Sequence, residues 1–250
     1  MTAFNAAGLR AQPGESMAAT AVGTRQGVRR ATHTDTAAVA ALLASAYQGD
    51  PLFCWLLPDP RERAQRMPAL MRLFVTHAIS VGRVDLTRTG EAAAVWIDVD
   101  TTRPIPNLRG VAEVCGRHYV RFRRLDRALG DHHPVDRAHA YLAFIAVAPH
   151  RQRNGVGAAL LRHRLAELDA KRIPAYLEAT THRSAAWFSR RRFRRLGEHL
   201  RLDDAAERGL VLTPMWREPT VTPPRRRGRF GHSAPTGEPS GRSAQRRDAS

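Results

Sequence analysis

The sequence predicts an α/β (α+β) domain, and three features of the chain indicate that class. The run from Tyr141 to Val147 is dense in aromatic and β-branched residues, as a buried strand is. Apolar residues at roughly helical spacing begin near Gly155 and predict an amphipathic helix. Upstream, Arg83 to Arg88 and Glu91 to Asp98 predict a β-hairpin around a Thr-Gly turn.

The remaining predicted elements follow from the same kinds of pattern. In chain order they are a strand and a helix within Val28 to Pro51, with Thr34 or Asp35 as the helix N-cap, a helix from Asp59 to Gly82, a strand from Ile173 to Ala179, a short helix from Ser184 to Arg192, and closing strands from Arg194 to Arg201 and from Leu210 to Trp216. One domain is therefore predicted over residues 27–217. Segments 1–26 and 218–250 are expected to be disordered, because they hold few residues that a core could bury.

The chain is strongly basic, with a formal net charge of +17, and its 40 lysines and arginines include a single lysine, Lys171. Arginines of the C-terminal segment, such as Arg225 to Arg227, could bind the phosphates of a nucleic acid. A bias towards arginine at every exposed basic position is the simpler explanation, because the excess extends over the whole chain. Nucleic-acid binding is therefore a minor alternative, and the charge is expected to attract small anions.

Cysteine usage and hydropathy bear on the compartment. Cys54 and Cys115 have no metal-ligand spacing, and a reducing cytosol is the expected location. The longest apolar run, near Ala37 to Ala46, is shorter than the roughly 20 residues of a membrane span. The first residues do not resemble a secretion signal, so we expect neither secretion nor a membrane partner. The segment Asp131 to His133 is expected to be a loop, with no metal bound.

The loop between the predicted strand and the predicted helix has the character of an anion site. Gly155 and Gly157 remove side chains where the backbone enters the first helical turn, whose N–H groups have no acceptor within the helix. The helix dipole adds about half a positive charge there, and Arg151 and Arg153 add full charges. A P-loop would need Gly-Lys-Ser/Thr, and a dinucleotide fingerprint would need GxGxxG; neither is present.

A family resemblance accounts for this loop. The string QRNGVG, from Gln152 to Gly157, preceded by Val147 and Pro149, resembles the Q/RxxGxG/A signature of the GNAT acyl-CoA N-acyltransferases. The resemblance implies a central mixed, mostly antiparallel, splayed sheet flanked by helices. The strings DPLFCWLLPDPRERAQRM, GEAAAVWID and IPAYLEATTHR are most similar to the puromycin N-acetyltransferase-like branch, and the likeness covers most of residues 27–216.

The resemblance also implies acetyl-CoA as a co-substrate. The loop amides would hold its pyrophosphate, and the main chain of the preceding strand would pair with the pantetheine arm and meet the thioester carbonyl. The implied cofactor-binding residues are Ile145, Ala146, Val147, Gln152, Arg153, Asn154, Gly155, Val156, Gly157, Ala158 and Phe188.

Acetyl transfer to an amine benefits most from a general base. Glu178, at the end of a predicted strand, is the first candidate, with an arginine ion pair as its alternative role; His182 and His33 are weaker candidates. The family's usual acid, a tyrosine, aligns with Phe188, which has no proton to give. Ser184 stands where Asn is common, and Arg192 replaces the glycine usual before Phe193. Ser184, Tyr176 or water could supply the proton instead.

The acceptor is expected to be a small-molecule primary amine. It would dock over Pro51 to Pro58, Asn107 to Gly130 and Thr180 to Arg183. The residues that could line an apolar pocket for an aromatic amine, or could equally be core, are Phe53, Trp55, Leu56 and Leu57. Direct acetyl transfer is the leading hypothesis. A relative that binds acyl-CoA without efficient turnover is the main alternative, and a basic nucleic-acid binder is the third.

Overall fold

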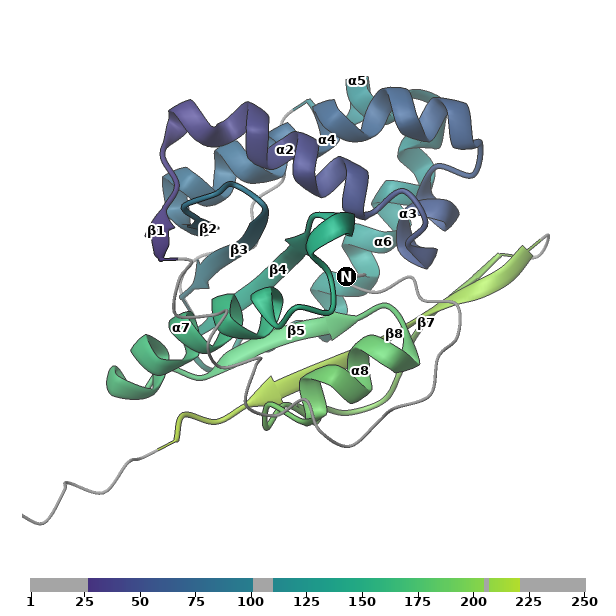
Figure 1. Ribbon diagram of the computed structural model, residues 1–250. Coiled ribbons are helices and arrows are strands. Elements are labelled where there is room, and N and C mark those ends of the chain that lie inside the picture. The colour runs from purple at the N-terminus through teal and green to yellow at the C-terminus, as the bar shows by residue number, and fades with distance from the viewer. Residues whose placement is uncertain (1–26, 101–109, 205–206, 221–250) are drawn as a thin grey trace, which may run out of the picture.

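The computed structural model describes residues 27–100, 110–204 and 207–220. One eight-stranded sheet with strand order β1-β2-β3-β4-β5-β8-β6 organises them, and β7 pairs with β8 outside that path. Helices flank the sheet (Figure 1). The α/β class and the mostly antiparallel sheet are thus confirmed. The two predicted disordered segments lie largely outside the described residues, as does the start of the predicted acceptor segment, 107–109.

The N-terminal part contains β1 (Val28–Arg30), η1 (His33–Asp35), α2 (Thr36–Ala46), α3 (Pro51–Leu56) and α4 (Pro60–Val81). Of the two predicted N-caps, Asp35 holds that position in α2 and Thr34 does not. Each of the next two helices starts with an Asp cap followed by proline. Asp50 accepts a hydrogen bond from the Leu52 amide, and Asp59 accepts one from the Glu62 amide.

The predicted hairpin is present as β2 (Gly82–Thr87) and β3 (Ala92–Val99). Gly90, in the turn, has a φ of 74° that favours glycine. Gly82 passes so close to β3 that an added Cβ would lie 2.3 Å from the Trp96 carbonyl oxygen. Glycine is therefore required where α4 turns directly into the sheet.

The prediction of a loop at residues 131–133 is wrong for Asp131 and His132. After α5 (Val111–Cys115) and η2 (Gly116–His118), α6 runs from Tyr119 to His132 and includes Asp131 and His132. The helix forms because Tyr119, Phe122 and Leu125 recur every third residue and pack against the core. His133, just beyond its end, is buried.

The strand, loop and helix of the predicted anion site are β4 (His139–Val147), η3 (Pro149–Arg151) and α7 (Val156–Ala170), followed by β5 (Ala175–Ala179). The pair β4–β5 is parallel, whereas the other recorded pairs of this sheet are antiparallel. It pairs only at Ala140 with Ala175 and at Tyr141 with Tyr176. Beyond these residues the two strands separate.

The C-terminal elements shift two predicted boundaries. Helix α8 spans His182–Ser189, so it begins and ends before the predicted Ser184 to Arg192. The single strand predicted from Arg194 to Arg201 is instead two, β6 (Arg194–Arg195) and β7 (Leu200–Asp204), because Gly197 turns the chain with a φ of 64°. The last strand, β8 (Glu207–Arg217), pairs with both and with β5.

Helices α2, α4 and α7 pack on the strands β2, β3 and β4 (Figure 1). Helix α8 packs on β5 and β8. The core fills the space between helices and sheet. Phe53, Leu56 and Leu57 are 3%, 1% and 0% exposed, which resolves their alternative roles in favour of the core. Among the helices in the described ranges, none combines the length and hydropathy needed to cross a bilayer.

Candidate functional site

The edge of β4 that faces β5 carries main-chain groups that pair with no strand, and the register identifies them. Ala148 donates its N–H to the Glu91 carbonyl, so even-numbered residues at this end of β4 bond to β3. In an antiparallel ladder the intervening residues point the other way. The N–H and C=O of Ile145 and Val147 therefore face the gap left by the separation of β4 from β5.

The loop after β4 folds back towards this gap. The Gln152 side-chain amide donates to the Val147 carbonyl at 3.2 Å. Gly155 caps α7 with a φ of 74° and offers no side-chain acceptor to the first-turn amides. An added Cβ on Gly157 would lie 3.1 Å from Cγ2 of Val147. The glycines thus place bare N–H groups beside the strand edge, as an anion site requires.

A cavity of about 230 Å³ joins these parts. It is lined by Ile145, Val147, Arg151, Gln152, Arg153, Gly155, Val156, Gly157, Ala158, Trp187 and Arg191. Three of these residues are arginines, which suits a polyanionic ligand such as a diphosphate. Most of the cofactor-binding residues implied by the sequence are therefore gathered around one cavity.

Three of the implied residues do not line this cavity. Ala146 is paired with Ala93 of β3, and Asn154 is exposed in the loop. Phe188 is 1% exposed and packs edge-on against Trp187 and Phe193, which makes it a core residue.

Two lining residues are not identified by sequence reasoning. Trp187 lines the cavity, and the Arg191 guanidinium lies 3.6 Å from the centre of its ring. Burial, together with the positive charges of Arg190 and Arg162, lowers the pKa of Arg191 to about 10. Trp187 lies on α8 and Arg191 in the turn after it, and only the fold brings both next to the loop that follows β4.

Glu178 lies on β5, two residues beyond the last paired residue of the parallel ladder. Its carboxylate is buried, and Oε1 has no hydrogen-bond partner among the described residues. Burial raises the pKa of Glu178 to about 7, although the hydroxyls of Tyr141 and Tyr176 act in the opposite direction. No arginine pairs with Glu178 in the parts of the chain that the structure describes, which disfavours the ion-pair alternative.

The other proposed proton carriers have different surroundings. The Ser184 hydroxyl donates to the Thr181 carbonyl at 2.9 Å and belongs to the N-terminal cap of α8. The Tyr176 hydroxyl is buried beside the Glu178 carboxylate. His33 is exposed on η1, whereas His182 lines a second cavity.

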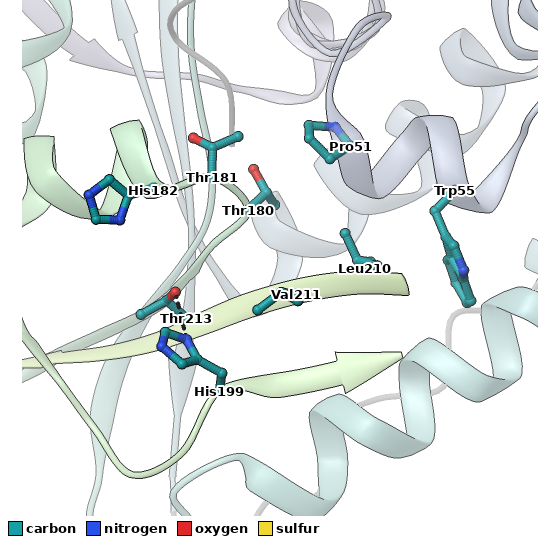
Figure 2. Close-up of a pocket in the computed structure, with 9 residues that line it drawn as sticks. All are labelled: Pro51, Trp55, Thr180, Thr181, His182, His199, Leu210, Val211 and Thr213. Atoms are coloured by element: carbon teal, nitrogen blue, oxygen red, sulfur yellow. Dashed lines mark hydrogen bonds between the residues drawn. The ribbon is translucent and has the colours of Figure 1, made fainter. Parts of the chain in front are cut away.

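This second cavity, of about 470 Å³, lies between α3, the start of α8 and the β7–β8 hairpin (Figure 2). It is lined by Pro51, Trp55, Thr180, Thr181, His182, His199, Leu210, Val211 and Thr213. One wall is apolar, with Trp55 and Leu210; the other carries hydroxyls and imidazoles, including a His199–Thr213 hydrogen bond of 3.1 Å. None of the described lining residues is Asp or Glu.

Thr180 connects this cavity to the strand that carries Glu178. Its hydroxyl donates to the buried Asp50 carboxylate at 2.8 Å, and Asp50 also caps α3. Trp55 lines the same cavity, and its Nε1 has no partner among the described residues. Two of the three predicted acceptor segments, around Pro51 and around Thr180, therefore meet here.

The segment with adjacent histidines forms a different arrangement. The buried rings of His133 and His139 are joined by a hydrogen bond of 3.0 Å between their Nε2 atoms. Burial and the neighbouring His139 lower the pKa of His133 to about 4. Within the described residues, no group of three or more His, Cys, Asp or Glu side chains could hold a metal ion.

Comparisons with known proteins agree with this geometry. A family model described as "Acetyltransferase (GNAT) family" matches residues 119–197. The fold resembles the crystal structure of a histone acetyltransferase HPA2 and related acetyltransferase from Corynebacterium glutamicum, with 26% identity, a TM-score of 0.60, and coverage of 79% of this chain and 98% of that one.

Two further structures share the fold at lower identity. A Drosophila melanogaster polyamine N-acetyltransferase is 16% identical with a TM-score of 0.60, covering 77% of this chain and 99% of that one. An agmatine N-acetyltransferase is 15% identical with a TM-score of 0.55 and the same coverages. The family match and these folds together support an acyltransferase enzyme with the GNAT fold.

Proposed function

We propose that this chain, an acyltransferase with the GNAT fold, transfers the acetyl group of acetyl-CoA directly to a primary amine of a small molecule. The observation that carries the proposal is a single cavity bounded both by the free edge of β4 and by the first turn of α7. Such a cavity suits a ligand with an amide-containing arm, which can pair with the strand edge, joined to a diphosphate, which can accept hydrogen bonds from the first-turn amides.

In the proposed complex, the amides of Gly157 and Ala158 bind the diphosphate, and Arg153 and Arg191 supply opposite charge. The pantetheine arm then lies along β4 and takes up the main-chain groups of Val147 that face the gap. The Gln152 side chain, which now bonds the Val147 carbonyl, would turn away or bridge to the ligand.

The second cavity is the proposed acceptor site. The structurally similar enzymes act on a polyamine and on agmatine, by their names. Such molecules carry more than one positive charge, and a cavity without a described carboxylate gives a second charge no partner. The cavity therefore favours an amine with one charge, a flat apolar body against Trp55 and hydroxyl groups towards Thr181 and His199, such as an aminonucleoside.

Glu178 is the proposed general base. Neutralising an alkylammonium with a pKa of about 10.4 at pH 7 costs roughly 4.6 kcal/mol, and a base of matched pKa reduces that barrier. The ammonium gives its proton to Glu178, directly or through water, and the amine attacks the thioester carbon. The C–N bond forms, the C–S bond breaks, and the departing thiolate takes up the proton that the new amide nitrogen loses. Glu178 then returns its proton to solvent.

A catalytically impaired relative is the second candidate, and the surroundings of Phe188 and Ser184 favour it. Phe188 is buried without a hydroxyl, and the Ser184 hydroxyl is already bonded in the cap of α8. Against it, a thiol has a pKa of about 8.5, so thiolate can leave at neutral pH without an acid. The free cysteines Cys54 and Cys115 fit the proposed cytosolic location.

The test combines binding and turnover. Calorimetric titration with acetyl-CoA should show one saturable site. Incubation of the protein with acetyl-CoA and each of a panel of monoamines should release free thiol from acetyl-CoA. Acetyl-CoA binding without thiol release for any amine of the panel would support the impaired relative. Absence of acetyl-CoA binding would contradict both proposals.

A further inference from the structure

The hydroxyl of Tyr47 lies in the gap between β4 and β5. There it contacts the main chain of Ile145, the residue nearest the proposed thioester. It accepts the Ile145 N–H at 3.1 Å and donates to the Ile145 carbonyl at 3.1 Å. Both main-chain groups of Ile145 that face the gap are thus bonded to one side chain from another element. In the proposed function, the same N–H meets the carbonyl oxygen of the acetyl group.

The position of Tyr47 is fixed by its packing. It follows the last residue of α2 and is 0% exposed. Its ring makes edge contacts with Phe53, at 5.5 Å between centroids, and with Phe144, at 5.6 Å. Phe144 and Phe74 of α4 also contact each other, at 5.1 Å. An aromatic wall therefore holds the hydroxyl against β4 and prevents it from swinging to the surface.

The surroundings of Tyr47 also keep its proton in place. Burial and the nearby Asp50 side chain raise the pKa of the hydroxyl well above its usual value. Tyr47 is thus a permanent hydrogen-bond donor at neutral pH and a poor source of a transferred proton. This distinguishes it from a general acid.

We propose that Tyr47 is a catalytic residue that donates a hydrogen bond to the thioester carbonyl oxygen, next to the N–H of Ile145. The inference rests on the proposed function. The incoming oxygen shares the Ile145 N–H with the Tyr47 hydroxyl oxygen, and the hydroxyl turns its proton from the Ile145 carbonyl to that oxygen. Attack by the amine then converts the carbonyl to an oxyanion held by two donors, and collapse expels the thiolate. Tyr47 keeps its proton throughout.

The variant Tyr47→Phe removes the donor and keeps the ring that packs on Phe53 and Phe144. Loss of one oxyanion donor typically lowers kcat by about 10²- to 10³-fold. We expect a loss of that order in thiol release, with the acetyl-CoA dissociation constant changed by less than about threefold. Ser80→Ala is the control, because it removes an exposed hydroxyl that donates only to the Thr76 carbonyl of α4, away from both cavities, and it should keep full activity.

A second measurement is independent of turnover. The infrared band of acetyl-CoA labelled with ¹³C at the thioester carbonyl moves to lower frequency with each hydrogen bond that the oxygen accepts. Bound to the wild type, the band should lie below its position in Tyr47→Phe. A fluorinated tyrosine introduced at position 47, a stronger donor of nearly the same size, should lower it further and covers the case in which the phenylalanine variant fails to fold.

These outcomes separate the two proposals. Equal band positions in the wild type and the variant would overturn the role of Tyr47 and leave the acetyltransferase assignment intact. Tighter acetyl-CoA binding with unchanged kcat would also overturn it, because Tyr47 would then only occupy the empty gap. Failure of the wild type to bind acetyl-CoA would overturn the proposed function and this inference together.

Discussion

Replacing Glu178 by Gln should remove activity and, at neutral to alkaline pH, stabilise the protein. The pKa of Glu178 rises from 4.5 to about 7 in the folded state, mainly through burial. Between pH 4.5 and 7 the folded chain therefore holds a proton that the unfolded chain has released, and stability falls as pH rises through this window. The difference of about 2.5 pKa units corresponds to about 3 kcal/mol at pH 8.

The side-chain amide introduced by Glu178→Gln does not titrate, so this loss disappears in the variant. Below pH 4.5 the difference in Tm between Glu178→Gln and the wild type should be constant. At pH 8 the Tm of the variant should have risen relative to that of the wild type by about 6–12 °C, at about 2–4 °C per kcal/mol for a domain of this size. Differential scanning calorimetry between pH 4.5 and 8 measures this difference. Glu113→Gln, at an exposed residue of α5, is the matched control and should show no such divergence.

The same variant tests catalysis. Thiol release should fall by about 10²- to 10⁴-fold, the range expected for removal of a general base, while calorimetry shows unchanged acetyl-CoA affinity. Two results would refute this reasoning: Tm curves of the wild type and Glu178→Gln that stay parallel across the pH range, or equal losses of turnover and affinity. Either would mean that Glu178 is an ordinary structural carboxylate.

Other consequences concern the cofactor loop and the buried imidazoles. Gly157→Val should weaken acetyl-CoA binding by about 10- to 100-fold in a calorimetric titration, because the new side chain meets Val147 and covers first-turn amides. Gly130→Val is the control and should bind acetyl-CoA with unchanged affinity, because nothing lies within 4 Å of an added Cβ there. Arg191→Gln should weaken binding by about tenfold and make it less sensitive to salt; an unchanged salt dependence would exclude Arg191 from the phosphate site. His133→Asn should reduce the loss of stability at acidic pH. The pKa of His133 is lowered to about 4, so the wild type loses stability as pH falls from about 6.5 to 4. The variant should lose less stability over this range in the same calorimetric scans.

Much of the fold followed from local pattern. The hairpin of β2 and β3, the long helix α4 and the β4–loop–α7 unit lie within one or two residues of their predicted bounds, because each combines clear periodicity with a strong terminal signal such as Asp59-Pro60 or Gly155. Helices α5 and α6 were not predicted, and adjacent histidines with a nearby proline suggested a loop at the C-terminal end of α6. Tertiary packing of its apolar face determined the outcome.

The candidate site divides in the same way. Main-chain features such as the first turn of α7 were predictable from glycine spacing, because they depend on local backbone geometry. Tyr47, Trp187 and Arg191 were not identified, because their positions depend on contacts between segments far apart in the chain; Tyr47 and Ile145 are 98 residues apart. The high pKa of Glu178 likewise arises from burial by neighbouring strands, which no local pattern reports.

The most direct measurement is a calorimetric comparison of acetyl-CoA with S-acetylpantetheine, which has the same thioester and no diphosphate. If the amides of Gly157 and Ala158 and the surrounding arginines bind the diphosphate, acetyl-CoA should bind at one site and S-acetylpantetheine far more weakly. Equal affinities, or no binding of acetyl-CoA, would contradict the account.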